Sequence, residues 1–338
     1  MTTRTPARAR KTEFSARIQQ MANREFFDRL PLKETPDPGQ CQFSTIQNDG
    51  TGPATVECVM PGTDPLIVKL FADDTGSHSY EMLEALWNDG FGDQSNFRVA
   101  EPLRFVDDLN LFAMKRAPGE CLGDYVTRDR ERALSGVQRA ARWIARLHSS
   151  DMRRGRLDQP WYMFTKLADR LTKAAAVRPE WLKFLTSKID LLSDAGDRLE
   201  VVTPVQTHGQ YRPIHVFIKD DITTVIDLDR SRPGDPARDV AEFIHRLRST
   251  FQREQGEQAE ADRLTDAFLA EYQAAGRPLP ANLPFFRGFH VLVSLCRHMK
   301  RLHPEHSDWD GTISYYTEEL ENALQDDTSE ATKGKEAS

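Results

Sequence analysis

A short β-hairpin pattern lies inside an otherwise helical half of the chain, and it limits the folds that this sequence can adopt. β-Branched residues gather over 201–228, where the runs 215–218 and 222–226 are joined by the polar turn Lys219-Asp220-Asp221. Amphipathic spacing predicts helices on both sides of it, near 137–148, 159–175, 179–194, 257–275, 284–301 and 312–325. Beyond Pro118-Gly119 we therefore expect a mainly helical unit that contains one hairpin.

The residues before Pro118 have the pattern of strands. Alternating runs at 41–48, 54–60 and 65–71 are separated by turn-forming residues, and 97–116 indicates further strands around a turn at Asp107–Asn110. Between them, Met82, Leu83 and Leu86 have helical spacing in a segment from Tyr80 to Trp87. The expected structure is a small antiparallel sheet of about five strands with one helix.

These patterns predict an α+β, two-lobed chain with four segments. Residues 1–30 form a basic tail and a helical segment from Glu13 to Leu30, 31–116 form the sheet-containing N-lobe, 117–325 form the helical C-lobe, and 326–338 form a disordered tail. The first residues are rich in Arg and Thr and lack acids, and no apolar run follows. A floppy basic tail and a targeting peptide both have this composition.

Composition excludes some classes of function. A formal net charge of −7 over 338 residues argues against a general nucleic-acid binder, and it fits an acidic enzyme with a cationic small-molecule substrate. No apolar window has the length of a membrane span. The 4 cysteines are far apart and form no CxxC pair, which favours a reducing cytoplasm over a disulfide or zinc framework. The sequence gives no indication of oligomeric state.

The hairpin is flanked by the motifs that indicate chemistry. Thr207-His208-Gly209-Gln210-Tyr211-Arg212-Pro213-Ile214-His215 precedes it, Val225-Ile226-Asp227-Leu228-Asp229 ends it, and Gly234-Asp235-Pro236-Ala237-Arg238-Asp239 follows. Their order and spacing resemble the catalytic loop, metal-binding segment and helix start of the aminoglycoside phosphotransferase and choline kinase superfamily, which has a protein kinase-like fold. The family's loop is His-Gly-Asp, four residues that include a Pro, and Asn.

Two positions of the loop depart from that family pattern. Gln210 stands where the family has its catalytic Asp, and His215 stands where it has a metal-binding Asn. A glutamine can orient an attacking hydroxyl but has no useful basicity, and losing a general base typically costs about 10²–10⁴ in rate. Imidazole is a poor Mg²⁺ ligand, so we expect His215 to hydrogen-bond a phosphate or to bind a metal such as Mn²⁺.

The resemblance implies roles for other charged residues. It assigns the metal to Asp227, with Asp229 sharing the site, whereas a strand-end carboxylate can also simply cap a turn. It assigns Lys69 to the nucleotide phosphates, oriented by Glu81 rather than Glu84, although a lone strand lysine often faces solvent.

The segment Leu111–Gly119 resembles the family's hinge between the lobes. There Ala113, Met114, Lys115 and Arg116 would supply the backbone groups that bind adenine. The resemblance implies that His208 holds the loop in place rather than acting in catalysis, and that Asp235 and Asp239 cap and brace it.

The expected function is ATP-dependent transfer of phosphate to a hydroxyl of a small molecule, with Mg²⁺ or Mn²⁺ as cofactor. Gln210 and Asp227 would be the residues at the reacting groups. Two alternatives remain open from the sequence. Loss of the base and of a metal ligand together is typical of a pseudokinase, and the same fold also supports nucleotidyl transfer.

Overall fold

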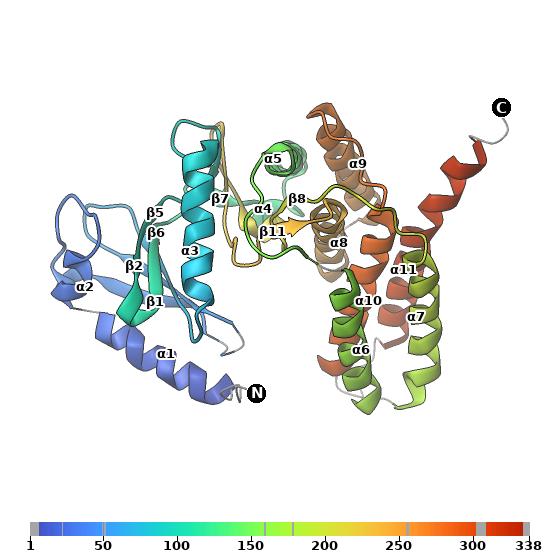
Figure 1. Ribbon diagram of the computed structural model, residues 1–338, viewed down its shortest axis with the longest axis horizontal. Helices are drawn as coiled ribbons and strands as arrows, with labels where there is room; N and C mark the ends of the chain where they lie inside the picture. Colours follow the sequence, from blue (N-terminus) through green and yellow to red (C-terminus); the bar gives the residue numbers. More distant parts are fainter. Residues whose placement is uncertain are drawn as a thin grey trace. The chain divides into compact units, whose positions relative to one another are not determined.

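The computed structural model describes residues 7–21, 23–48, 50, 52–158, 160–177, 179–254, 257–301 and 309–333. The chain divides into two compact units, shown as ribbons in Figure 1. The first unit contains the residues up to Asp124 together with Ile214–Arg230, and the second contains Tyr125–Pro213 and the residues from Ser231. In the part of the chain that is described, no helix is long and apolar enough to cross a membrane.

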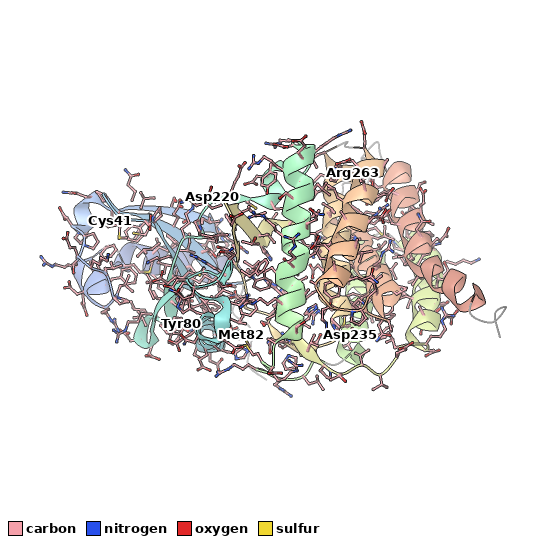
Figure 2. All side chains as sticks on the ribbon, turned by 90° about the horizontal axis from the view of Figure 1, so that it is seen from above. Cys41, Tyr80, Met82, Asp220, Asp235 and Arg263 are labelled. Carbon is pink, nitrogen blue, oxygen red and sulfur yellow. The ribbon has the colours of Figure 1, made fainter. Side chains whose placement is uncertain are left out.

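An antiparallel sheet forms most of the first unit. Its five strands lie in the order β1-β2-β3-β6-β5. They are β1 (Gln42–Gln47), β2 (Ala54–Val59), β3 (Leu66–Leu70), β5 (Pro102–Val106) and β6 (Leu111–Lys115). Helix α3 (Thr75–Leu86) packs on β5 and β6, with Tyr80 and Met82 labelled on it in Figure 2. The five-stranded sheet and helix α3 agree with the sheet and the helix predicted from the sequence for this part of the chain.

Two helices precede this sheet and contribute to its core. They are α1 (Ala7–Met21) and α2 (Arg24–Asp28), so α1 begins within the segment that was expected to be a basic tail. Phe14 and Phe27 are fully buried in the same cluster as Val56 and Val68. Arg17 donates hydrogen bonds to the carbonyl oxygens of Phe71, Leu109 and Asn110, which fixes α1 to the ends of β3 and of the β5–β6 turn.

The hairpin strands are β9 (Val216–Lys219) and β10 (Ile222–Val225), joined at Asp220 (Figure 2). β10 pairs in parallel with β4 (Phe97–Val99), and β9 pairs with β7 (Glu120–Cys121). These pairings place the hairpin in the first unit, although the sequence assigned it to the helical lobe. Gly119 makes the close approach possible, because its φ is +90° and an added Cβ would lie 2.1 Å from the Ile218 carbonyl oxygen.

Helices form most of the second unit. They are α5 (Arg130–Ser149), α6 (Pro160–Val177), α7 (Leu182–Gly196), α8 (Ala237–Arg253), α9 (Gln258–Ala274), α10 (Leu283–Arg301) and α11 (Trp309–Lys333). α10 packs against α6, α7, α8 and α11 (Figure 1). The predicted helices are all present, and most lie within a few residues of their expected bounds, but α5 begins earlier and α11 ends later than expected.

Three smaller features complete the chain. β8 (Val205–Thr207) pairs with β11 (Arg232–Gly234), whereas the β-branched run at 201–203 forms no strand. Helix α4 (Leu122–Tyr125) follows β7. Short turns of tighter helix lie at Pro38–Gln40, Asp107–Leu109, Pro179–Trp181 and Pro213–His215, and Trp87–Phe91 forms a wider turn.

The end of α11 differs from the expectation of a disordered tail over 326–338. The helix continues to Lys333, and 334–338 lie outside the described residues. No Gly or Pro occurs between Thr312 and Lys333, so no residue in this stretch breaks a helix once it has begun.

Candidate active site

The first unit contains a buried group of opposite charges. The Lys69 ammonium, on β3, donates hydrogen bonds to Asp227 Oδ1 at 2.6 Å and to Asp229 Oδ2 at 2.9 Å. The Lys69 side chain is 7% exposed, and those of Asp227 and Asp229 are 29% and 20% exposed. One cation thus faces two carboxylates in a region that is largely shielded from water.

The electrostatics of this group follow from its one-to-two ratio of charges. Burial disfavours the Lys69 ammonium, but the charges of Asp229 and Asp227 outweigh burial and raise the pKa of Lys69 above its ordinary value. Burial also raises the pKa of Asp229, and Asp227 adds to the rise while Lys69 opposes it. Lys69 is therefore charged at neutral pH. Asp229 is the carboxylate whose charged form an additional cation would stabilise most.

The backbone after β10 directs the carboxylates toward Lys69. Asp227 has a φ of +70°, in the left-handed region that a residue with a Cβ seldom adopts. The preceding Ile226 donates its backbone N–H to the His215 carbonyl oxygen at 3.0 Å. His215 Nε2 lies 3.4 Å from Asp227 Oδ2, so the structure brings together Lys69, Asp227, Asp229 and His215. Strain of this kind is common where a functional side chain must be held in one direction.

Glu81 does not join this group. It is exposed on α3, and the nearby Glu84 accepts a hydrogen bond from the Tyr80 hydroxyl at 3.4 Å. The residues of α3 that line a small pocket beside Lys69 are Ser79 and Leu83. The helix turns its apolar face inward, and that rotation points the two glutamates toward solvent. Sequence reasoning missed Ser79, which shares the inward face of the helix.

The backbone N–H groups of the hinge residues that were expected to bind adenine already have partners within the protein. Ala113 and Met114 lie inside β6, which is paired on both edges by β3 and β5. The Lys115 N–H is bonded to the Glu101 carbonyl oxygen and the Arg116 N–H to that of Pro65. The next residue, Ala117, is buried, and its N–H has no hydrogen-bond partner among the described residues. Ala117 is therefore a hinge residue whose amide is available to donate to a ligand.

In the second unit, one carboxylate braces the loop that carries Gln210. Asp239 is fully buried and accepts hydrogen bonds from the backbone N–H groups of His208, at 2.6 Å, and Gly209, at 2.8 Å. His148 Nε2 lies 3.2 Å from Asp239 Oδ2 and its Nδ1 lies 2.8 Å from the Tyr272 hydroxyl. Asp239 thus has the bracing role that the sequence indicated.

The charge state of Asp239 is set by its neighbours. Burial would raise the pKa of Asp239, but the hydrogen bond and charge of His148 hold it below its ordinary value.

Gly209 has a φ of +78°, which favours glycine at the turn, and Gln210 follows it as a partly buried side chain. Asp235, labelled in Figure 2, accepts from the Ala237 N–H at 2.8 Å and caps α8.

The donor atoms at Asp227 and Asp229 fit a divalent cation, because hard cations prefer carboxylate oxygens. In the described residues, however, no cluster of three or more His, Cys, Asp and Glu side chains is arranged as a metal site, and Lys69 is the cation that the two carboxylates bind. His215 adds an imidazole nitrogen next to Asp227, which suits Mn²⁺ better than Mg²⁺.

Comparison with known proteins identifies the family. Residues 48–283 match the sequence profile of the phosphotransferase enzyme family. The chain belongs to that family. The match includes Lys69, the hinge, the Gln210 loop, the hairpin and Asp227. Among curated proteins, no sequence matches the chain significantly.

Solved structures with the same fold support the two-lobed kinase-like architecture. Choline kinase from Cryptosporidium parvum is 10% identical, with a TM-score of 0.63 over 93% of this chain and 97% of that chain. Amicoumacin kinase hAmiN, solved with AMP-PNP, Ca²⁺ and Ami, is 12% identical, with a TM-score of 0.58 over 93% and 96%. ADP-bound aminoglycoside phosphotransferase APH(2'')-Ib is 14% identical, with a TM-score of 0.53 over 92% and 98%. At these identities the likeness shows the fold alone.

Proposed function

We propose that this phosphotransferase transfers the γ-phosphate of ATP to a hydroxyl group of a small molecule. The observation that supports the proposal best is the ion group of Lys69, Asp227 and Asp229. Phosphoryl transfer depends mainly on positioning and on neutralising charge, and a buried lysine beside two carboxylates supplies both a phosphate-binding cation and a cation-binding pair.

The nucleotide would bind in the first unit. Lys69 would hold the phosphates, and the Ala117 N–H would donate to the adenine ring. ADP and AMP-PNP occur in the APH(2'')-Ib and amicoumacin kinase structures, which supports the same class of ligand here. A divalent cation, when bound, would neutralise the phosphate oxygens. Asp227 and Asp229 would hold it, and both would have to exchange part of their contact with Lys69 for the cation.

Gln210 and His215 would act by hydrogen bonding. The amide of Gln210 can accept from the acceptor hydroxyl and hold its oxygen in line, but the proton must leave to water or to the phosphate itself. His215 would bind the cation next to Asp227 or donate to a phosphate oxygen. Since imidazole favours borderline metals, we expect Mn²⁺ to support binding and turnover better than Mg²⁺.

A second function, nucleotide binding without transfer, is favoured by one observation. Gln210 lacks the basicity of the aspartate that the family has there, and Lys69 already pairs with both carboxylates without a metal. A pseudokinase of this kind would bind ATP and act by its shape.

Turnover assays separate these functions. Wild type, Asp227→Ala and Gln210→Asp are incubated with ATP, with Mg²⁺ or Mn²⁺, and with a panel of amino alcohols, sugars and hydroxy acids. Phosphorylated product and ADP in wild type, lost in Asp227→Ala, support the kinase. Product only in Gln210→Asp supports a pseudokinase with an intact site. Release of pyrophosphate instead of ADP would identify nucleotidyl transfer and would refute both.

A further inference from the structure

Arginines surround one buried carboxylate in the second unit. Glu242, on α8, is 6% exposed, and its Oε1 accepts from Arg212 Nε and Nη2, both at 2.7 Å. Arg246 follows one turn later on α8, and its Nε lies 3.5 Å from the same oxygen. Arg212 therefore holds Oε1 of Glu242 with two N–H groups, and Arg246 is a second cation near the same oxygen, at a longer distance.

Arg246 is short of hydrogen-bond acceptors. Its side chain is 20% exposed, and its Nε is buried without a hydrogen-bond partner among the described residues. Burial and the charge of Arg212 both lower the pKa of Arg246, with Glu242 opposing them. A guanidinium has five N–H donors, and leaving the buried Nε–H of Arg246 unsatisfied costs free energy. Such a cation is a suitable partner for an anion from outside the protein.

A histidine from another helix adds a further ring nitrogen without a hydrogen-bond partner among the described residues. His290, on α10, is 6% exposed, and its Nε2 has no partner in the described part of the chain. Burial lowers the pKa of His290 to about 4, and its charged neighbours are Glu242, Arg246, Arg238 and Arg212. At neutral pH this ring is uncharged and can donate one N–H without adding to the charge repulsion.

The local charge is positive, in contrast to the acidic chain as a whole. Arg238 forms a close ion pair with Asp158, which cancels both charges. Arg212 and Arg246 then face the single charge of Glu242. The net charge of −7, which suggested a cationic substrate, describes the whole surface and not this cluster.

The cluster is next to the loop that the proposed function uses. Arg212 follows Gln210 by two positions in the sequence, and its hydrogen bond to Glu242 fixes that loop to α8. A ligand bound at Arg246 would therefore lie in the same unit as the residue that orients the acceptor.

We infer that the acceptor carries an acidic group, a carboxylate or a phosphate, which binds to Arg246 with Arg212 and His290 beside it. Identifying the bound anion as the phosphoryl acceptor rests on the proposed kinase function. Binding of an anion at Arg246 does not require catalysis. Bidentate binding of carboxylate or phosphate oxygens is the geometry for which a guanidinium is best suited.

Inorganic phosphate and acetate are the probes for the test. Each is titrated by calorimetry and by thermal shift at constant ionic strength against chloride, with EDTA present so that no metal-bound phosphate contributes. Wild type should bind at least one of the two, and Arg246→Gln should bind it at least about tenfold more weakly. Equal affinity in wild type and Arg246→Gln, or no binding of either probe by wild type, would overturn the inference.

Two further variants test the role of Arg246 itself. Arg246→Lys keeps the charge but loses the planar fork, and should bind the anion with intermediate affinity. Arg253→Gln removes an exposed arginine from the same α8 helix and should leave anion binding unchanged. Without anion, Arg246→Gln should melt at or above the wild-type temperature, because Arg246 is poorly paired. A clear fall would show that Arg246 is a structural counterion of Glu242 and would contradict the inference.

The result is separable from the proposed kinase function. ADP with a divalent metal is titrated into the same proteins. If ADP binds normally while Arg246→Gln has no effect on the anion, the anion site is wrong and the kinase proposal stands. If ADP fails to bind, the kinase proposal fails and the anion titration still decides the site.

Discussion

Lys69 Nζ lies 2.6 Å from Asp227 Oδ1, although 158 positions separate the two residues along the chain. The contact joins the third strand of the sheet to the segment that follows the hairpin. Both residues belong to the first unit, so the ion group is a property of that unit by itself. The hairpin therefore positions the Asp227 and Asp229 carboxylates next to Lys69 in the sheet.

Replacing Lys69 by Met should destabilise the protein by about 3–5 kcal/mol at pH 7, since two partly buried carboxylates would lose their buried counterion. Part of this loss should be recovered at pH 5. The pKa of Asp229 is already raised in the folded state, so the folded protein takes up the proton first and gains stability as the pH falls. Urea unfolding at the two pH values measures both effects.

Lys115→Met is the matched control for this experiment. Lys115 forms an ion pair of 2.8 Å with Glu101, but the two side chains are 43% and 34% exposed. An exposed pair of this kind contributes about 0–1 kcal/mol. If Lys69→Met were no more destabilising than Lys115→Met, the ion group would not be the buried, coupled unit described above.

Asp239→Asn should destabilise the second unit by about 3 kcal/mol or more. The carboxylate accepts from two backbone N–H groups, and an amide would direct N–H donors at one of them. Asp266→Asn, at an exposed position of α9, should change the free energy of unfolding by less than about 0.5 kcal/mol. Thermal unfolding followed by circular dichroism compares the two, and equal melting temperatures would refute the bracing role.

His290 should make the protein less stable as the pH falls. Its pKa is about 4 in the folded state, below the ordinary value of 6.5, so between these values the unfolded chain binds the additional proton. Lowering the pH from 6.5 to 5 should therefore cost wild type about 1–2 kcal/mol more than it costs His290→Gln. Other buried histidines titrate in both proteins, and the difference between the two pH profiles isolates His290. Parallel profiles would contradict the assignment.

The sequence predicted the elements whose signals are local. The hairpin and the amphipathic helices follow from spacing and from residue type, and most of them lie close to their expected positions. The position of Glu81 also had a local signal that was not used. Ser79, Met82, Leu83 and Leu86 have the i, i+3, i+4, i+7 spacing of one inward face, which leaves Glu81 outside.

The remaining differences depend on contacts between distant segments. The amides of Lys115 and Arg116 are occupied because Glu101 and Pro65 lie beside them, and no pattern near residue 115 reveals those partners. The start of α1 at Ala7 likewise depends on the burial of Phe14 and on the hydrogen bonds of Arg17 to the sheet. Local propensity predicted a basic tail at these residues, because the sheet residues that stabilise α1 are far away in the sequence.

Calorimetric titration of ADP into wild type and Asp227→Asn, with no metal, with Mg²⁺ and with Mn²⁺, tests whether the ion group of Lys69, Asp227 and Asp229 is a nucleotide and metal site. We expect metal-dependent binding to wild type, stronger with Mn²⁺, and at least about tenfold weaker binding to Asp227→Asn, in which Lys69 still pairs with Asp229. Failure of wild type to bind ADP with either metal, or equal affinity in the two proteins, would contradict this role.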